Sequence, residues 1–138
     1  MPANKIKVVI DTNLWISFLI SKNFKNLDNL FTIDRLVLIF SDQLLEEFIE
    51  VAKRPKFEKF FSLTDLIILL NQIYSKAKFI EVKSEVNLCR DPNDNFLLSL
   101  AKDSNADYLI SGDKDLLEIQ KFEKTRIVTF SEFISNYN

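Results

Sequence analysis

Four acidic residues lie where the surrounding sequence leaves room for chemistry. Asp11 directly follows the apolar run IKVVI at 6–10, and Asp113 follows the apolar run DYLI at 107–110 by two residues. Glu47 and Asp94 lie on predicted helices, after the second apolar run and before the fourth. Ligands of parallel α/β sheets bind at the carboxyl ends of strands, so these acids are expected to converge. Converging carboxylates repel one another and require a cation.

The absence of histidine narrows the chemistry that such a cluster can perform. The chain has no His, one Cys and one Gly in 138 residues, which excludes His-based relays, His-ligated or thiolate zinc sites and glycine-rich phosphate loops. The single cysteine, Cys89, forms no internal disulfide. All-oxygen ligands select Mg²⁺ or Mn²⁺, and a metal-bound water is a nucleophile that needs no histidine.

Each acid also has a simpler interpretation. Asp91 can cap a helix whose first turn contains Pro92 and Asp94, and Asp113 can cap the short helix that follows it. Glu47 can be one of several solvated glutamates, since Glu46 and Glu50 are its neighbours. Asp11 is harder to explain in this way, because packing gives no reason for an acid directly after a buried strand.

Strands that alternate with helices are expected to place these acids. Apolar runs predict five strands, at 6–10, 36–40, 78–82, 107–110 and 126–129. Helical spacing and capping residues predict helices at 24–31, from Ser41 or Asp42 to about 54, 62–75, from Asp91 onward, 113–119, and from Ser131 to the end. The segment 14–21 is apolar without clear periodicity, and it is expected to form either a separate helix or one broken helix with 24–31. This alternation predicts a three-layer α/β/α sandwich with a mostly parallel sheet.

Composition indicates one globular domain over residues 1–138. The hydrophobic fraction is 47% and the net charge is −2, so there is no global electrostatic reason to bind nucleic acid. No apolar stretch is long enough to span a membrane, and no signal peptide is evident, so a cytoplasmic location is expected. Local positive charge occurs at Lys53, Arg54, Lys56 and Lys59, interleaved with phenylalanines. These four are candidate RNA contacts, with a structural connector as the simpler interpretation.

Several segments together resemble PIN-domain proteins, in the branch of toxin components of type II toxin–antitoxin modules related to the virulence-associated protein C toxins. They are VVIDTNLW (8–15), LLEEFIEVAKRPKF (44–57), RDPNDNFLLSLA (90–101) and ADYLISGDKDLL (106–117). The resemblance implies a Mg²⁺- or Mn²⁺-dependent endoribonuclease, a homodimer and an antitoxin that blocks the site. The alternatives are a catalytically inactive PIN-like interaction module and, less favoured, a phospho-acceptor receiver domain.

The resemblance also assigns residues. It places the catalytic and metal-binding acids at Asp11, Glu47, Asp94 and Asp113, with Glu46 as the alternative to Glu47 and Asp115 as the alternative to Asp113. Asn13 and Ser111 match polar residues that support the first acid and the metal waters. Gly112 is expected to form a tight, strained turn that aims Asp113 at the metal, so that Gly112→Val should impair activity.

Overall fold

The sheet is six-stranded and parallel except at one edge. The computed structural model describes residues 5–21, 24–88 and 92–136. The strand order is β3-β2-β1-β4-β6-β5, and only β5 runs antiparallel to its neighbour. The bounds are β1 Ile6–Ile10, β2 Leu36–Phe40, β3 Ala77–Phe79, β4 Tyr108–Ile110, β5 Lys121–Phe122 and β6 Thr125–Val128. Five strands lie where the sequence predicts them, and the two-residue β5 is an addition.

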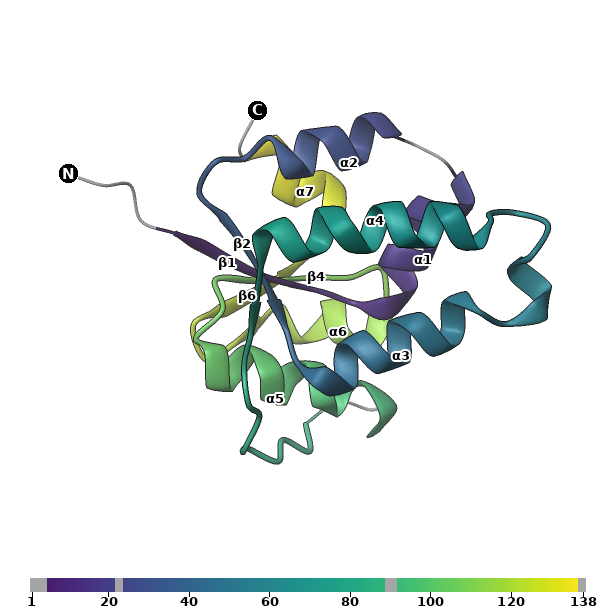
Figure 1. Cartoon of the computed structure of the whole chain (residues 1–138). Helices are drawn as coiled ribbons and strands as arrows, with labels where there is room; N and C mark the ends of the chain where they lie inside the picture. The colour runs from purple at the N-terminus through teal and green to yellow at the C-terminus, as the bar shows by residue number, and fades with distance from the viewer. Residues whose placement is uncertain (1–4, 22–23, 89–91, 137–138) are drawn as a thin grey trace.

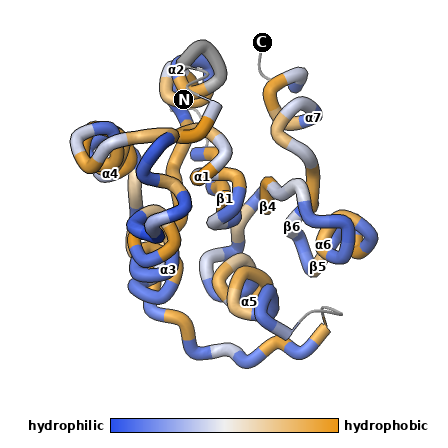
Figure 2. The backbone as a smooth tube through the Cα atoms, turned by 90° about the vertical axis from the view of Figure 1, so that its right-hand side faces the viewer, coloured by the Kyte–Doolittle hydropathy of each residue, from blue (hydrophilic) through white to orange (hydrophobic). Residues whose placement is uncertain are grey.

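Helices cover both faces of this sheet, which confirms the predicted three-layer sandwich. Figure 1 shows α1, α2, α4 and α7 above the strands and α5 and α6 below them, with α3 beside α1 at the end where β1 and β2 finish. Along the helices, hydrophobic and hydrophilic residues alternate, as expected for helices with one buried side (Figure 2). The bounds are α1 Thr12–Ser21, α2 Phe24–Phe31, α3 Asp42–Ala52, α4 Leu63–Lys76, α5 Asn95–Ser104, α6 Lys114–Ile119 and α7 Phe130–Ser135, with 3₁₀ turns η1 Pro55–Phe57 and η2 Pro92–Asp94.

An aromatic cluster around Trp15 holds α1 against α3. The Trp15 side chain is fully buried, and its ring centroid lies 5.8 Å from Phe18, 6.1 Å from Phe40 and 6.2 Å from Phe48. Aromatic pairs at these separations contribute beyond the area they bury. Because Phe48 follows Glu47 on α3, this contact also sets the position of Glu47 relative to the start of α1.

The N-cap residues of three helices can be compared with those predicted from the sequence. The Ser41 hydroxyl accepts the Leu44 N–H at the start of α3, and Ser62 and Asp65 form a reciprocal capping box on α4, both as predicted. The prediction that Ser131 caps the last helix is wrong. Thr129 is the cap, because Glu132 lies three residues after it and completes a capping box.

The segment before β4 departs from prediction in its details. The strand predicted at 78–82 is confined to Ala77–Phe79. Asp91 and Cys89 lie outside the described residues, and the helix predicted to open at Asp91 consists of the η2 turn followed by α5. Within the ranges that the structure describes, none of the helices has the length and apolar character needed to cross a bilayer.

Candidate active site

The four predicted acids line one cavity. A cavity of about 190 Å³ opens at the carboxyl ends of β1 and β4, which are parallel neighbours in the sheet. Asp11 follows β1, Asp113 follows β4, Glu47 comes from α3 and Asp94 from the start of α5. Residues far apart in the sequence thus meet at one edge of the sheet. The lining consists of Asp11, Thr12, Asn13, Glu47, Val51, Arg54, Asp94, Phe96, Leu97 and Asp113.

Asp11 is the most deeply buried of these acids, with 6% of its surface exposed. Its Oδ1 accepts the Leu14 N–H at 2.8 Å, and its Oδ2 accepts the Ser111 hydroxyl. Burial raises the pKa of Asp11 above its usual range, and the negative charge of Asp113 adds to the rise, although the bonds from Ser111 and Leu14 oppose it. Asp11 is therefore a carboxylate whose charge the fold disfavours and a nearby cation would stabilise.

Ser111 connects two of the acids. It is 1% exposed, donates its hydroxyl to Asp11 and accepts the Asp113 N–H at 2.9 Å. Asn13 also lines the cavity. Both residues thus lie beside the acids that the sequence pairs them with, and their supporting role remains a prediction.

Glu47 faces the cavity, whereas its neighbour Glu46 is exposed and does not line it. The Glu47 Oε2 accepts the Thr12 hydroxyl at 2.6 Å, which joins α3 to the first residue of α1. Thr12 is a residue of this cavity that the sequence analysis does not predict. Its position directly after Asp11 is the signal that marks it.

Asp113 combines two roles that the sequence presents as alternatives. Its Oδ1 accepts the N–H groups of Asp115 at 2.8 Å and Leu116 at 3.3 Å, so it caps α6, and its side chain also lines the cavity. Asp115 does not line the cavity. Asp94 stands at the cap position of α5 without a side-chain capping bond, and its Oδ2 is buried.

The four candidate RNA contacts differ in their position relative to the cavity. Arg54 lines the cavity, but the other three candidate RNA contacts, Lys53, Lys56 and Lys59, do not. Lys56 lies over the ring of Phe57, with Nζ 5.1 Å from the centroid.

The prediction of a strained turn at Gly112 is wrong. The backbone there has no positive φ, and a Cβ added to it would meet nothing within 4 Å. Ser111 and the capping bonds of Asp113 hold this turn without a glycine-specific conformation.

The donor chemistry fits a hard divalent cation with a water shell. The polar lining offers carboxylate, hydroxyl and amide oxygens and no sulfur. Within the described ranges, however, no group of three or more Asp, Glu or Cys side chains is arranged to hold a metal ion directly. Mg²⁺ commonly takes one or two carboxylates and keeps several waters, so a cavity of this size with acids around its rim suits such an ion.

One curated protein and one solved structure are similar to this chain. A protein of Methanocaldococcus jannaschii described as "Uncharacterized protein MJ1680" is 34% identical over 145 residues, covering 96% of this chain and 92% of that protein. The PIN domain of human SMG5 superposes with a TM-score of 0.53 at 11% identity, covering 96% of this chain and 99% of that structure. At that identity the likeness concerns the fold.

A model described as PIN domain matches residues 7–115, which contain all four acids of the cavity. PIN domains are generally nucleases that bind divalent metal ions. The structure has the matching architecture, and the matched residues make up most of its length. The chain belongs to the PIN domain family and has its nuclease fold.

Proposed function

We propose that this protein is a Mg²⁺- or Mn²⁺-dependent endoribonuclease that hydrolyses phosphodiester bonds of RNA at the acid-lined cavity. The observation that carries the proposal is the convergence of Asp11, Glu47, Asp94 and Asp113 on a single cavity from four parts of the chain. A helix-capping role or a solvent-exposed position can explain any one of these acids, but neither explains why all four line the same cavity. Packing alone also gives no reason to bury Asp11.

In this proposal, Asp11 and Asp94 hold the metal ion. Glu47 and Asp113 lie on the same lining and accept hydrogen bonds from its water shell or bind it directly. When bound, the ion supplies a water of lowered pKa and neutralises charge on the scissile phosphate. The Leu14 N–H and the Ser111 hydroxyl fix the orientation of the Asp11 carboxylate, so its free lone pairs point in a constant direction.

Among the described residues, Arg54 is the one positively charged side chain on the lining of the cavity. Its guanidinium is suited to bidentate contact with a phosphate group. We therefore assign Arg54 to substrate phosphate binding. Lys53, Lys56 and Lys59 lie on the same stretch of chain outside the cavity, and a role for them in binding flanking RNA remains a prediction.

A cleavage assay on a long structured RNA, with Mn²⁺, Mg²⁺ or EDTA, tests this function. Asp11→Asn and Asp94→Asn should each abolish cleavage and leave the fold intact, whereas Glu46→Gln should cleave at the wild-type rate. Metal-dependent cleavage that survives both Asp→Asn changes would refute the assignment. A wild-type protein that cuts RNA in no metal would instead support the alternative of an inactive interaction module.

The biological setting follows from the resemblance to toxins of toxin–antitoxin modules. We propose that the protein is such a toxin and that a small antitoxin protein covers the acidic cavity. The direct test is whether a neighbouring gene encodes a protein that binds this chain and inhibits the cleavage. A purified neighbour product that leaves cleavage unchanged would count against this role.

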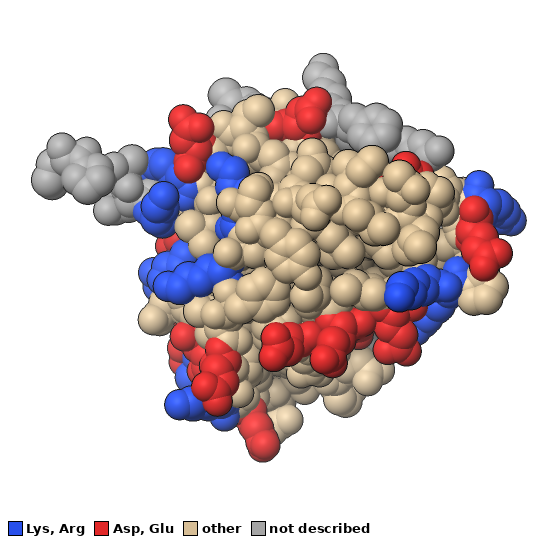
Figure 3. Space-filling view, in the orientation of Figure 1, with Lys and Arg blue, Asp and Glu red and all other residues tan. Residues whose placement is uncertain are grey.

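The exposed side of α4 supports the proposal of a homodimer. Figure 3 shows a broad uncharged surface where α4 lies. Six exposed apolar side chains on or next to α4 present on the order of 500 Å² of surface, which is within the range of the largest apolar patch on a typical monomer, and such patches are often functional. In a dimer formed through this surface, the apolar patch and a surrounding polar rim on each partner together approach the roughly 800 Å² per partner that a specific interface needs. The six are Phe60, Leu63, Ile67, Ile68, Tyr74 and Phe79.

Sedimentation analysis tests the dimer. Ile67 is 49% exposed, so Ile67→Asp should convert a wild-type dimer to a monomer without loss of stability. Leu88 is 55% exposed and lies after β3, outside α4, and Leu88→Asp serves as a matched control that should remain dimeric. A wild-type protein that is monomeric at high concentration, or a dimer unaffected by Ile67→Asp, would contradict the proposal.

A further inference from the structure

Positive side chains gather at the end of the sheet opposite the acid-lined cavity. There, at the amino ends of β1, β4 and β6, a cavity of about 330 Å³ is lined by four cationic side chains and one carboxylate. The cations are Lys5, Arg35, Lys124 and Arg126, and the carboxylate is Asp107. The excess of positive charge is local, because the whole chain carries a net charge of −2.

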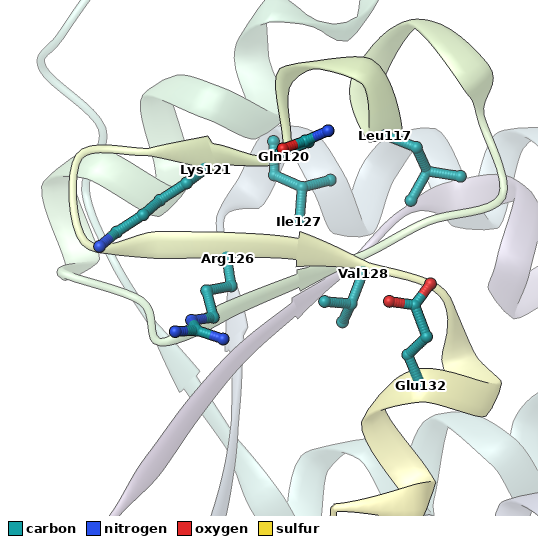
Figure 4. Close-up of a pocket in the computed structure, with 7 residues that line it drawn as sticks. All are labelled: Leu117, Gln120, Lys121, Arg126, Ile127, Val128 and Glu132. Atoms are coloured by element: carbon teal, nitrogen blue, oxygen red, sulfur yellow. The ribbon is translucent and has the colours of Figure 1, made fainter.

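A second cavity, of about 520 Å³, shares Arg126 with the first. It lies along the β5–β6 hairpin, and Figure 4 shows Lys121 and Arg126 extending from the two strands of that hairpin. Lys121 and Arg126 are direct cross-strand partners. Two like charges opposite each other destabilise a strand pair, so stability does not account for them.

Backbone hydrogen bonds hold these cations on a defined framework. The Ile6 N–H donates to the Arg35 carbonyl at 2.8 Å, and the Arg126 N–H donates to the Asp107 carbonyl at 3.0 Å. The cations therefore project from the ends of hydrogen-bonded strands and not from a long unsupported loop.

Two carboxylates line the same cavities, Asp107 in the first and Glu132 in the second (Figure 4), so the cations outnumber them. Lys124 lies 3.5 Å from Asp107. Within the described ranges, no carboxylate lies in ion-pair distance of Lys5, Arg35, Lys121 or Arg126. Four cations thus remain available to a ligand. We refer to these four residues with Lys124 as the basic edge.

We propose that the basic edge binds the phosphodiester backbone of the RNA substrate at a distance from the site of cleavage. The cations lie on or directly beside four strands, β1, β2, β5 and β6, and along two adjoining cavities, which suits an extended polyanion better than one small anion. Contacts to phosphate position a nucleic acid without reading its sequence. This inference rests on the proposed function, because it takes RNA as the substrate.

The separation from the acid-lined cavity limits which RNAs can use both places. Lys5 and Asp11 stand at opposite ends of β1, and six residues of extended strand span about 20 Å. A short oligonucleotide can occupy only the acid-lined cavity, whereas a longer RNA can also follow the surface to the basic edge. The basic edge should therefore lower KM for long RNA and leave kcat unchanged.

The test measures binding of a fluorescent single-stranded RNA to the full chain in EDTA, over a range of salt concentrations. The triple variant Lys5→Gln/Arg35→Gln/Arg126→Gln should bind more weakly, and its salt dependence should decrease by about 2 in the slope of log K against log salt. Arg126→Gln alone should lower the slope by about 0.7. Lys78→Gln is the matched control, because Lys78 is exposed on the opposite edge strand, β3, and should bind as wild type does.

The outcomes separate this inference from the proposed function. Equal affinity and slope in the triple variant and wild type, or an equal loss in Lys78→Gln, would overturn the basic edge as an RNA-binding surface. If the variants lose binding as expected but wild type cleaves no RNA in any metal, the proposed nuclease function fails and the binding surface stands. In a cleaving protein, the triple variant should show a raised KM and an unchanged kcat for long RNA, and both constants should be unchanged for a short oligonucleotide.

Discussion

The Asp11→Asn substitution tests two effects of the buried Asp11 charge, its destabilisation of the folded protein and its proposed role in metal binding. The Asn Oδ1 can still accept the Leu14 N–H, and its amide can donate to the Ser111 hydroxyl, so these two bonds can be kept. Burial and the charge of Asp113 raise the pKa of Asp11 in the folded state. The free energy of unfolding of wild type therefore falls as pH rises through that pKa, and the variant lacks this fall. At neutral pH in EDTA, we expect the variant to be the more stable protein.

Adding metal should reverse this order. A ligand present at 100 times its Kd stabilises a folded protein by about 2.7 kcal/mol. For a chain of 138 residues, the entropy of unfolding is about 0.3 kcal/mol/K, so the Tm of wild type should rise by about 9 °C. If Asp11→Asn weakens binding 100-fold, the stabilisation at the same metal concentration is about 0.4 kcal/mol, or roughly 1 °C.

Thermal unfolding over a Mn²⁺ titration, monitored by calorimetry at neutral pH, provides the measurement. Glu46→Gln is the control, because it removes an exposed carboxylate that does not line the cavity, and its Tm should rise as that of wild type does. An equal rise in Asp11→Asn would show that Asp11 does not hold the ion. No rise in wild type at millimolar Mn²⁺ would refute the metal site altogether.

Three further predictions follow from single contacts. Glu47→Gln should reduce RNA cleavage at least tenfold, with Glu46→Gln within twofold of wild type, and equal rates would remove Glu47 from the site. Gly112→Ala should change the free energy of unfolding by less than about 1 kcal/mol, since its Cβ meets open space, and a larger loss in denaturant titration would contradict this. Bonds from Ser84 hold the pKa of Asp103 below its usual range, so Asp103→Asn should destabilise the protein at neutral pH. That difference should vanish as pH falls through the lowered pKa, and a difference that persists in acid would exclude this origin.

The sequence predicts the positions of the acids well because the relevant signals are short-range. An apolar run followed by Asp11 marks a strand end, and parallel strands finish at the same edge. Helical spacing also favours Glu47 over Glu46. Glu47 flanks the apolar stripe through Leu44 and Phe48, whereas Glu46 points away from it.

Other features depend on contacts that no local pattern encodes. The strand β5 has two residues, too few to show any periodicity, and its pairing with β6 depends on positive φ angles at Gln120 and Glu123. Arg54 and Lys53 are adjacent basic residues, and only the end of α3 and the following turn decide that Arg54 lines the cavity. The basic edge combines residues from 5 to 126, so its charge is not apparent in any one segment.

Hydrogen bonds within the protein offset part of the repulsion among the acids. Asp11 accepts the Leu14 N–H, Glu47 accepts the Thr12 hydroxyl, and Asp113 accepts N–H groups at the start of α6. Hydrogen bonds to a carboxylate stabilise its charged form, so part of the mutual repulsion is offset within the protein. For that reason, a single Asp→Asn change is expected to affect catalysis without preventing folding.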